Sequence, residues 1–127
     1  MSAAIQSYRD LEIYKLSHNL AVEIHTMTIK ELPSFERFEE GSQIRRSSKS
    51  ISGNIVEGYG RRRYKAEFLR FLTYAHSSCD ETVEHLLFLR DTGSLSTSRS
   101  EYFLSSYSSL GRRIYTFISG VEREHHA

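Results

Sequence analysis

The side chains best suited to binding a ligand are cationic, and they crowd into the middle of the chain. Residues 45–70 hold eight basic and two acidic residues, a net charge of +6, in a chain whose net charge is +1. Arginine makes bidentate contacts to phosphate, and clustered cations gain affinity for nucleic acid by releasing counterions. Tyr59 and Tyr64 could stack on exposed bases. This composition predicts a nucleic-acid surface, with RNA as the preferred ligand, formed by Arg45, Arg46, Lys49, Tyr59, Arg61, Arg62, Arg63 and Lys65.

A second interpretation gives these arginines a structural role, in pairs with Glu57, Glu67 or an acidic helix of a neighbouring subunit. Glu57 lies three residues after Asn54, so the two share a helix face near the expected end of that helix. The macrodipole disfavours a carboxylate there unless a cation pairs with it. Arg61 or Arg46 could be that cation. We therefore expect a structural, non-catalytic motif made of Asn54, Glu57, Gly58 and Gly60, in which both glycines suit a left-handed helix cap.

Motifs for catalysis or for a metal centre are missing from the sequence. His76 and Cys79 lie three residues apart, but Cys79 falls on an apolar line and is expected to be a buried small side chain. The chain lacks the paired E-x-x-H motifs of di-iron bundles, and Gly58-Tyr59-Gly60-Arg61 lacks the spacing of a phosphate-binding loop. We expect no catalytic residue, no metal and no cofactor.

Apolar residues at helical spacing predict four amphipathic helices, over residues 11–32, 39–58, 64–92 and 98–121. Asp10 is expected to cap the first helix and Pro33 to stop it, while Gly93 ends the third. The run Ser98–Glu101 matches a capping box for the fourth. Four helices with short connectors predict an all-α, antiparallel, up-down-up-down four-helix bundle. It forms one domain, 1–127, with a loose arm at 1–9 and a frayed tail at 122–127.

Composition narrows the class of protein further. The chain has 127 residues, one proline and one cysteine, and 39% of its residues are hydrophobic. It holds no apolar run of the roughly 18 residues that a membrane span needs, and its first residues do not resemble a secretory signal. A lone cysteine cannot form an internal disulfide. These features predict a cytoplasmic protein that does not enter a membrane.

The segment from Gln43 to Leu72 carries a longer pattern, Q-I-R-R-x-x-x-S-I-x-x-N-I-x-E-G-x-G-R followed by E-F-x-x-F-L. This pattern resembles bacterial four-helix-bundle proteins encoded by intervening sequences in large-subunit ribosomal RNA genes, and LEIYKLSHNLAVEI resembles the family's opening helix. The resemblance covers residues 8–95. Many relatives carry alanines and a proline where this chain has Ser47, Ser48, Ser52 and Gly53.

The resemblance implies a bundle that assembles into a closed ring, typically a pentamer. It also implies a distant similarity to the accessory variability protein of diversity-generating retroelements, which works with a reverse transcriptase and RNA. Phe71, Phe88 and Leu69 lie outside the main apolar line of the third helix. The helix therefore carries more apolar surface than a bundle core needs. Two functions follow. One is a non-enzymatic homo-oligomer that binds RNA, and the other is a ring-forming scaffold for a protein partner, with the basic residues at subunit contacts.

Overall fold

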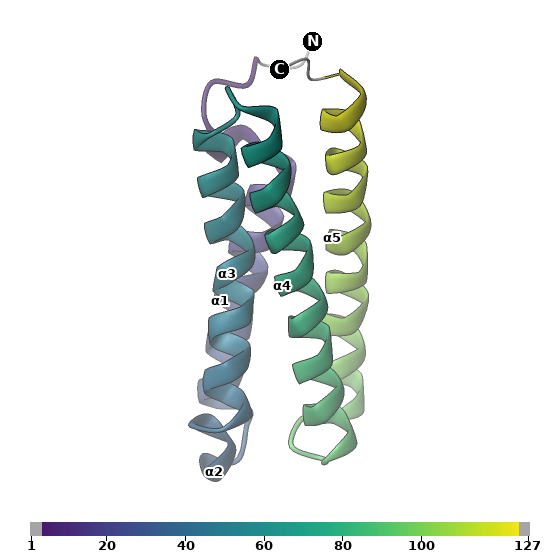
Figure 1. The fold of residues 1–127 in the computed structure, drawn as a ribbon. Coiled ribbons are helices and arrows are strands. Elements are labelled where there is room, and N and C mark those ends of the chain that lie inside the picture. Colours follow the sequence, from purple (N-terminus) through teal and green to yellow (C-terminus); the bar gives the residue numbers. More distant parts are fainter. Residues whose placement is uncertain (1–3, 125–127) are drawn as a thin grey trace.

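A computed structural model of the chain describes residues 4–124. Four long helices pack against one another and run alternately up and down (Figure 1). They are α1 (Glu12–Lys30), α3 (Glu40–Gly60), α4 (Lys65–Asp91) and α5 (Thr97–Glu124). The described residues contain no strand. The predicted all-α four-helix bundle is confirmed.

Two short elements accompany the bundle. The one-turn helix α2 (Ser34–Arg37) lies at the end where α1 connects to α3, in a segment expected to be a plain connector. The 3₁₀ helix η1 (Tyr8–Asp10) precedes α1 and packs against α1 and α3. The expected loose arm is therefore ordered at its end. At the other terminus, 122–124 continue α5 instead of fraying, and residues 1–3 and 125–127 lie outside the described part.

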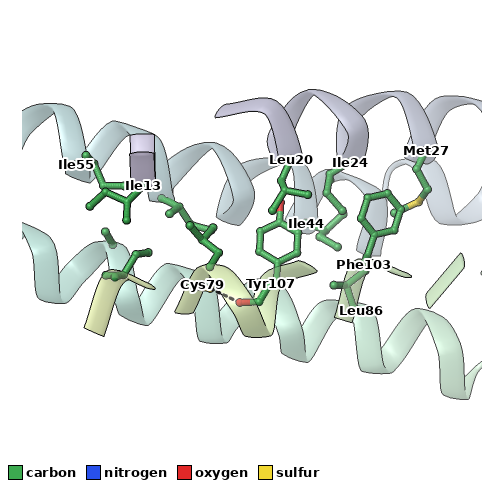
Figure 2. Close-up of a cluster of buried hydrophobic side chains, with 14 of the residues drawn as sticks. Ile13, Leu20, Ile24, Met27, Ile44, Ile55, Cys79, Leu86, Phe103 and Tyr107 are labelled. Carbon is green, nitrogen blue, oxygen red and sulfur yellow. Dashed lines mark hydrogen bonds between the residues drawn. The ribbon is translucent and has the colours of Figure 1, made fainter. Parts of the chain in front are cut away.

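The core follows the apolar periodicity of the sequence. Side chains from all four long helices are fully buried along the bundle axis (Figure 2). Cys79 is buried as expected, and its thiol donates a hydrogen bond to the carbonyl oxygen of Tyr107 at 3.4 Å. The largest fully buried side chains are Tyr107, Phe103, Ile24, Met27, Ile44, Ile51, Ile55, Leu72, Leu86, Leu89, Leu110 and Ile114.

The most extensive helix packing is between α3 and α4. Small side chains of α3 allow this approach. The Thr82 hydroxyl donates to the Ser47 hydroxyl at 2.9 Å, and the hydroxyls of Ser50 and Ser78 lie 2.9 Å apart. These bonds satisfy polar groups that would otherwise be unpaired in the interface. The serine-rich composition of α3 thus serves tight packing.

Three predicted helix ends were wrong in detail. Asp10 does not cap α1, because its carboxylate accepts from the backbone N–H of Gln6 and of Ser7 and closes a capping box around η1. Ser98 does not cap α5: the hydroxyl that accepts an N–H at this helix start belongs to Ser96, at 3.3 Å from the Arg99 nitrogen. The capping side chain is chosen by where the chain turns, which the S-x-x-E spacing alone could not show.

The third wrong end concerns the glycines of α3. Gly58 and Gly60 are not left-handed caps, because both lie inside α3 and the one positive φ among the described residues is that of Gly93, at 77°. Gly93 ends α4 as expected. Gly58 is needed for another reason, since a Cβ there would lie 3.1 Å from the Phe71 Cβ. Its lack of a side chain lets α4 come close.

Candidate nucleic-acid interface

The strongest candidate site is the turn between α3 and α4, at the end of the bundle opposite α2 (Figure 1). After Gly60 the chain turns through Arg61, Arg62 and Arg63, and Tyr64 precedes the first residue of α4. The Tyr64 N–H donates to the Arg61 carbonyl at 2.8 Å and closes the turn. All four of these side chains are exposed. The turn therefore presents three adjacent guanidinium groups to solvent.

Each of these arginines lies near the face of an aromatic ring. The Arg62 Cζ is 4.1 Å from the centre of the Tyr59 ring, the Arg61 Cζ is 4.9 Å from that of Phe71, and the Arg63 Cζ is 5.9 Å from that of Tyr64. Arg62 also donates to the Tyr59 carbonyl at 2.9 Å. Cation–π contacts of this kind hold long side chains in place without neutralising them. The turn is partly preorganised and still cationic.

Only one of the three arginines, Arg61, forms ion pairs with carboxylates of the described residues. Arg61 lies 3.5 Å from Glu57 and 3.3 Å from Glu67, and Arg70 lies 3.0 Å from Glu67. Of the two cations expected to pair with Glu57, Arg61 and Arg46, the structure shows Arg61 as the partner. The hydrogen bond from Arg70 lowers the pKa of the Glu67 carboxyl and raises the pKa of Arg70. Glu67 is thus ionised at neutral pH. Within the described residues, Arg62 and Arg63 pair with no carboxylate.

Arg70 extends this group of residues along α4, although it was not among the predicted site residues. Its Cζ lies 4.7 Å from the centre of the Phe71 ring and 5.7 Å from that of Tyr74. Phe71 therefore has two guanidiniums within cation–π range, from Arg61 and Arg70. The spacing of Arg70 to Glu67 and to Tyr74, three and four residues on a helix, was a signal that could have found it. We call Tyr59, Arg61, Arg62, Arg63, Tyr64, Glu67, Arg70 and Phe71 the turn cluster.

Two predicted site residues bind other parts of the protein. The Arg45 guanidinium donates to the Thr28 hydroxyl at 2.8 Å and to the Arg37 carbonyl at 3.0 Å, joining α3 to α1 and α2. Lys65 donates from Nζ to the Glu122 carbonyl at 2.8 Å, near the C-terminal end of α5. A cation is favourable there because the helix macrodipole is negative at that end. Both side chains have structural partners that lie far away in the sequence.

The two remaining basic residues, Arg46 and Lys49, lie on the outer part of α3, near its middle. No carboxylate of the described residues pairs with them. Fifteen residues separate Arg46 from Arg61, about 22 Å at about 1.5 Å per residue. The predicted basic surface is thus divided into the turn cluster and a separate mid-helix pair, Arg46 and Lys49.

The expected structural motif is only partly a unit. The Asn54 side-chain amide donates to the Ser50 carbonyl at 2.9 Å and to the Ser50 hydroxyl at 3.1 Å, so it stabilises the interior of α3. Glu57 belongs to the arginine network described above. Gly58 packs against α4, whereas a Cβ at Gly60 would meet nothing within 4 Å. The four residues therefore have separate local roles.

Metal-binding and membrane-spanning features are absent from residues 4–124. In that part of the chain, His, Cys, Asp and Glu side chains form no group of three that could hold a metal ion. None of the helices there is long and apolar enough to cross a membrane. The turn cluster is therefore built from guanidinium, phenyl, phenol and carboxylate groups alone, which suits an anionic ligand with flat aromatic parts.

Comparison with known protein families identifies the family of this chain. The model of the 23S rRNA-intervening sequence protein family matches residues 9–116. The chain belongs to the 23S rRNA-intervening sequence protein family. The matched range takes in α1, α2, α3, α4 and most of α5, so the turn cluster lies inside the family's shared region.

A solved structure supports the fold of this 23S rRNA-intervening sequence protein. It is a protein of unknown function from the S23 ribosomal protein family of Bacteroides thetaiotaomicron, with a TM-score of 0.77 and 23% sequence identity. The match covers 84% of this chain and 95% of the other. No curated protein matches the chain. Family membership thus fixes the architecture, and a role for the turn cluster has to be argued from its chemistry.

Proposed function

We propose that this 23S rRNA-intervening sequence protein is a non-enzymatic, cytoplasmic RNA-binding protein that contacts RNA through its turn cluster. The observation that carries the proposal is the set of three adjacent exposed arginines, each near an aromatic ring at 4.1 to 5.9 Å. Two of them have no carboxylate partner among the described residues, so their charge is available to phosphate. RNA recognition by proteins relies on phosphate contacts and on bases stacked against aromatic or guanidinium planes.

Single-stranded or looped RNA fits this chemistry better than a duplex. Tyr64 is 62% exposed at the turn. A base can stack on such a ring only when it is not already stacked in a helix. Arginine and tyrosine planes also accept any base, because every base has an aromatic face. We therefore expect binding with weak sequence preference and strong dependence on salt.

The test is a gel shift with a short single-stranded RNA at about 50 and about 200 mM salt, because affinity that depends on phosphate contacts falls steeply as salt rises over this range. The variant R62A/R63A removes two cations without breaking an ion pair. The control, K30A/R90A, removes two cations near the opposite end of the bundle, although it also removes the ion pair of Arg90 with the neighbouring Asp91. We expect R62A/R63A alone to weaken binding and to reduce the logarithmic salt slope by about 1.4, because each single-strand phosphate contact contributes about 0.7.

The proposal would be overturned by wild-type protein that does not bind RNA at micromolar concentration, or by affinity that ignores salt. Equal affinities for R62A/R63A and the wild type would move RNA binding away from the turn cluster. The mid-helix pair, Arg46 and Lys49, can then be tested in the same way as R46A/K49A. Circular dichroism should show equal helicity for every variant, since all these side chains are exposed or partly exposed.

We also propose that the protein works as a closed homo-oligomer, a pentamer by its resemblance to ring-forming relatives. Large apolar side chains outside the core support this: Phe88 is 50% exposed and Tyr115 is 65% exposed. Phe71 and Leu69, which also stood off the apolar line, are half-buried. A ring would cover exposed apolar surface, and it would repeat the turn cluster so that weak phosphate contacts add by avidity.

The second candidate function, a scaffold for a protein partner, is favoured by a different feature. Phe35 and Phe38, on and next to the short helix α2, are 71% and 77% exposed. Monomeric proteins seldom expose several large aromatic side chains together without a use for them. A protein that forms a ring but binds no RNA would support the scaffold, with the arginines then free to contact neighbouring subunits.

A further inference from the structure

Within the turn cluster, two guanidiniums converge on one carboxylate. Arg61 Nη1 lies 3.3 Å from Glu67 Oε1, while Arg70 donates through Nη2 to Oε1 and through Nε to Oε2, both at 3.0 Å. Two arginines around one pair of oxygens is also the arrangement that binds a phosphate group, because guanidinium donates in a planar fork to either anion. Glu67 therefore stands where phosphate oxygens would be held.

The two arginines have supports that do not depend on Glu67. Their Cζ atoms lie 4.9 and 4.7 Å from the centre of the Phe71 ring, and Arg70 Nη1 also donates to the Tyr74 hydroxyl at 3.4 Å. Phe71 is half-buried on α4, which fixes the ring they share. If the carboxylate moved aside, both guanidiniums would keep their aromatic contacts. The pair is preorganised for an anion other than its own glutamate.

Glu67 itself lies at the protein surface. Its side chain is 37% exposed at the surface of the first turn of α4, and among the described residues its carboxylate bonds only to the two arginines. The pair lies at the surface, where water and salt screen it, so another anion can compete with Glu67 for the same donors. A backbone phosphate presents two charged oxygens, as the carboxylate does, and can accept the same forked hydrogen bonds from the two guanidiniums. It would also keep the favourable position of an anion near a helix N-terminus.

We propose that Arg61, Arg70 and Phe71 form a phosphate seat that Glu67 occupies, so that Glu67 competes with the RNA backbone and limits its affinity. This inference rests on the proposed RNA-binding function and adds a regulation of the same site. It reverses the ordinary expectation for a residue inside a binding cluster. Neutralising a positioning residue weakens binding, whereas neutralising a competitor strengthens it.

The experiment compares E67Q with E57Q, which removes one negative charge beside the same Arg61 but leaves Arg70 untouched. We expect E67Q to bind the short single-stranded RNA at least about threefold more tightly than E57Q, with a logarithmic salt slope steeper by about 0.7 because one more phosphate is bound. The variant E67Q/R70A should lose this advantage. An E67Q affinity equal to or weaker than that of E57Q would overturn the inference, because Glu67 would then be a positioning residue or a bystander.

A second measurement separates the phosphate seat from RNA binding as such. Inorganic phosphate is titrated into wild-type protein and E67Q while the Nε–H resonances of Arg61 and Arg70 are followed by NMR. Saturable shifts of both resonances at lower phosphate concentration in E67Q support the seat, even if no protein binds RNA. Shifts that do not differ between E67Q and wild type overturn it, even if RNA binding by the turn cluster is established.

Discussion

Gly58 of α3 and Phe71 of α4 approach so closely that a Cβ on the glycine would lie 3.1 Å from the Phe71 Cβ and 3.4 Å from the Phe68 carbonyl oxygen. Both neighbouring atoms belong to the backbone of α4 or are attached directly to it, so neither can move without shifting the helix. The contact involves Phe71 of the turn cluster and sets the distance between α3 and α4 beside the turn that carries Arg61, Arg62 and Arg63. Two glycines of α3 with opposite surroundings make this testable.

We expect G58A to destabilise the protein by about 1 kcal/mol or more, because overpacking against a rigid helix outweighs the gain in helix propensity. The control is G53A, in the same helix, where a Cβ would meet nothing within 4 Å. There the alanine should stabilise by about 0.5–1 kcal/mol. Urea unfolding at one protein concentration measures both. A G58A variant as stable as G53A would show that α3 and α4 separate freely.

The start of α5 distinguishes a capping residue chosen by the fold from one suggested by sequence pattern. Ser96 accepts the Arg99 N–H at the beginning of the helix, whereas Ser98 is exposed in its first turn. We expect S96A to cost about 1 kcal/mol and S98A to change the free energy of unfolding by about 0.3 kcal/mol at most. Thermal unfolding of the two variants side by side decides it. The reverse order would restore the capping box that begins at Ser98.

Cys79 should be inert in the native protein. Burial raises the pKa of its thiol to about 12, so the reactive thiolate is scarce at ordinary pH. We expect no reaction with a disulfide reagent at about pH 8, near the ordinary pKa of a free thiol, until urea unfolds the bundle and exposes the single cysteine. Rapid labelling of folded protein would mean that α4 and α5 open readily around the Cys79–Tyr107 contact.

The same burial predicts how stability varies with pH. The folded pKa of Cys79, about 12, lies above the unfolded value of about 8.5, so its contribution is complete below about pH 8.5 and is lost as pH rises toward 12. Burial raises the pKa of Tyr107 in the same direction. Wild-type protein should therefore lose more stability between neutral and alkaline pH than C79A does. Equal losses would assign the alkaline effect to other groups.

The proposed ring makes a direct prediction about mass. One chain weighs 14.7 kDa. Light scattering on purified protein at micromolar concentration should give about five times that mass, and F88E should lower it if the exposed Phe88 lies at a subunit contact. A wild-type mass equal to one chain would refute the ring, and with it the increase in RNA affinity from avidity.

The sequence was sufficient for the bundle because burial of apolar side chains is periodic. Leu72, Ala75, Cys79, Leu86 and Leu89 recur at steps that keep them on one face of α4, and all of them are buried. Short connectors then leave few ways to pack four such helices. The ends of helices were less predictable, as Asp10 and Ser98 show, since several nearby polar side chains compete to cap each end.

The candidate site, like the fold, was predictable from the sequence in part. The sequence by itself determined that the basic residues gather in residues 45–70 and that Glu57 would have a cation partner, with Arg61, about one helical turn away, and Arg46 both possible; the structure pairs it with Arg61. Only the tertiary structure decided which of these cations remain available to bind a ligand and which bind other parts of the protein. Arg45 binds Thr28, Lys65 binds a carbonyl 57 residues away, and Arg61 and Arg70 share Glu67 over one ring. The spacing of Glu67 and Arg70 on one helix could be read in the sequence, but the contacts of Arg45 and Lys65 and the approach of Arg61 to Glu67 form only when the helices pack.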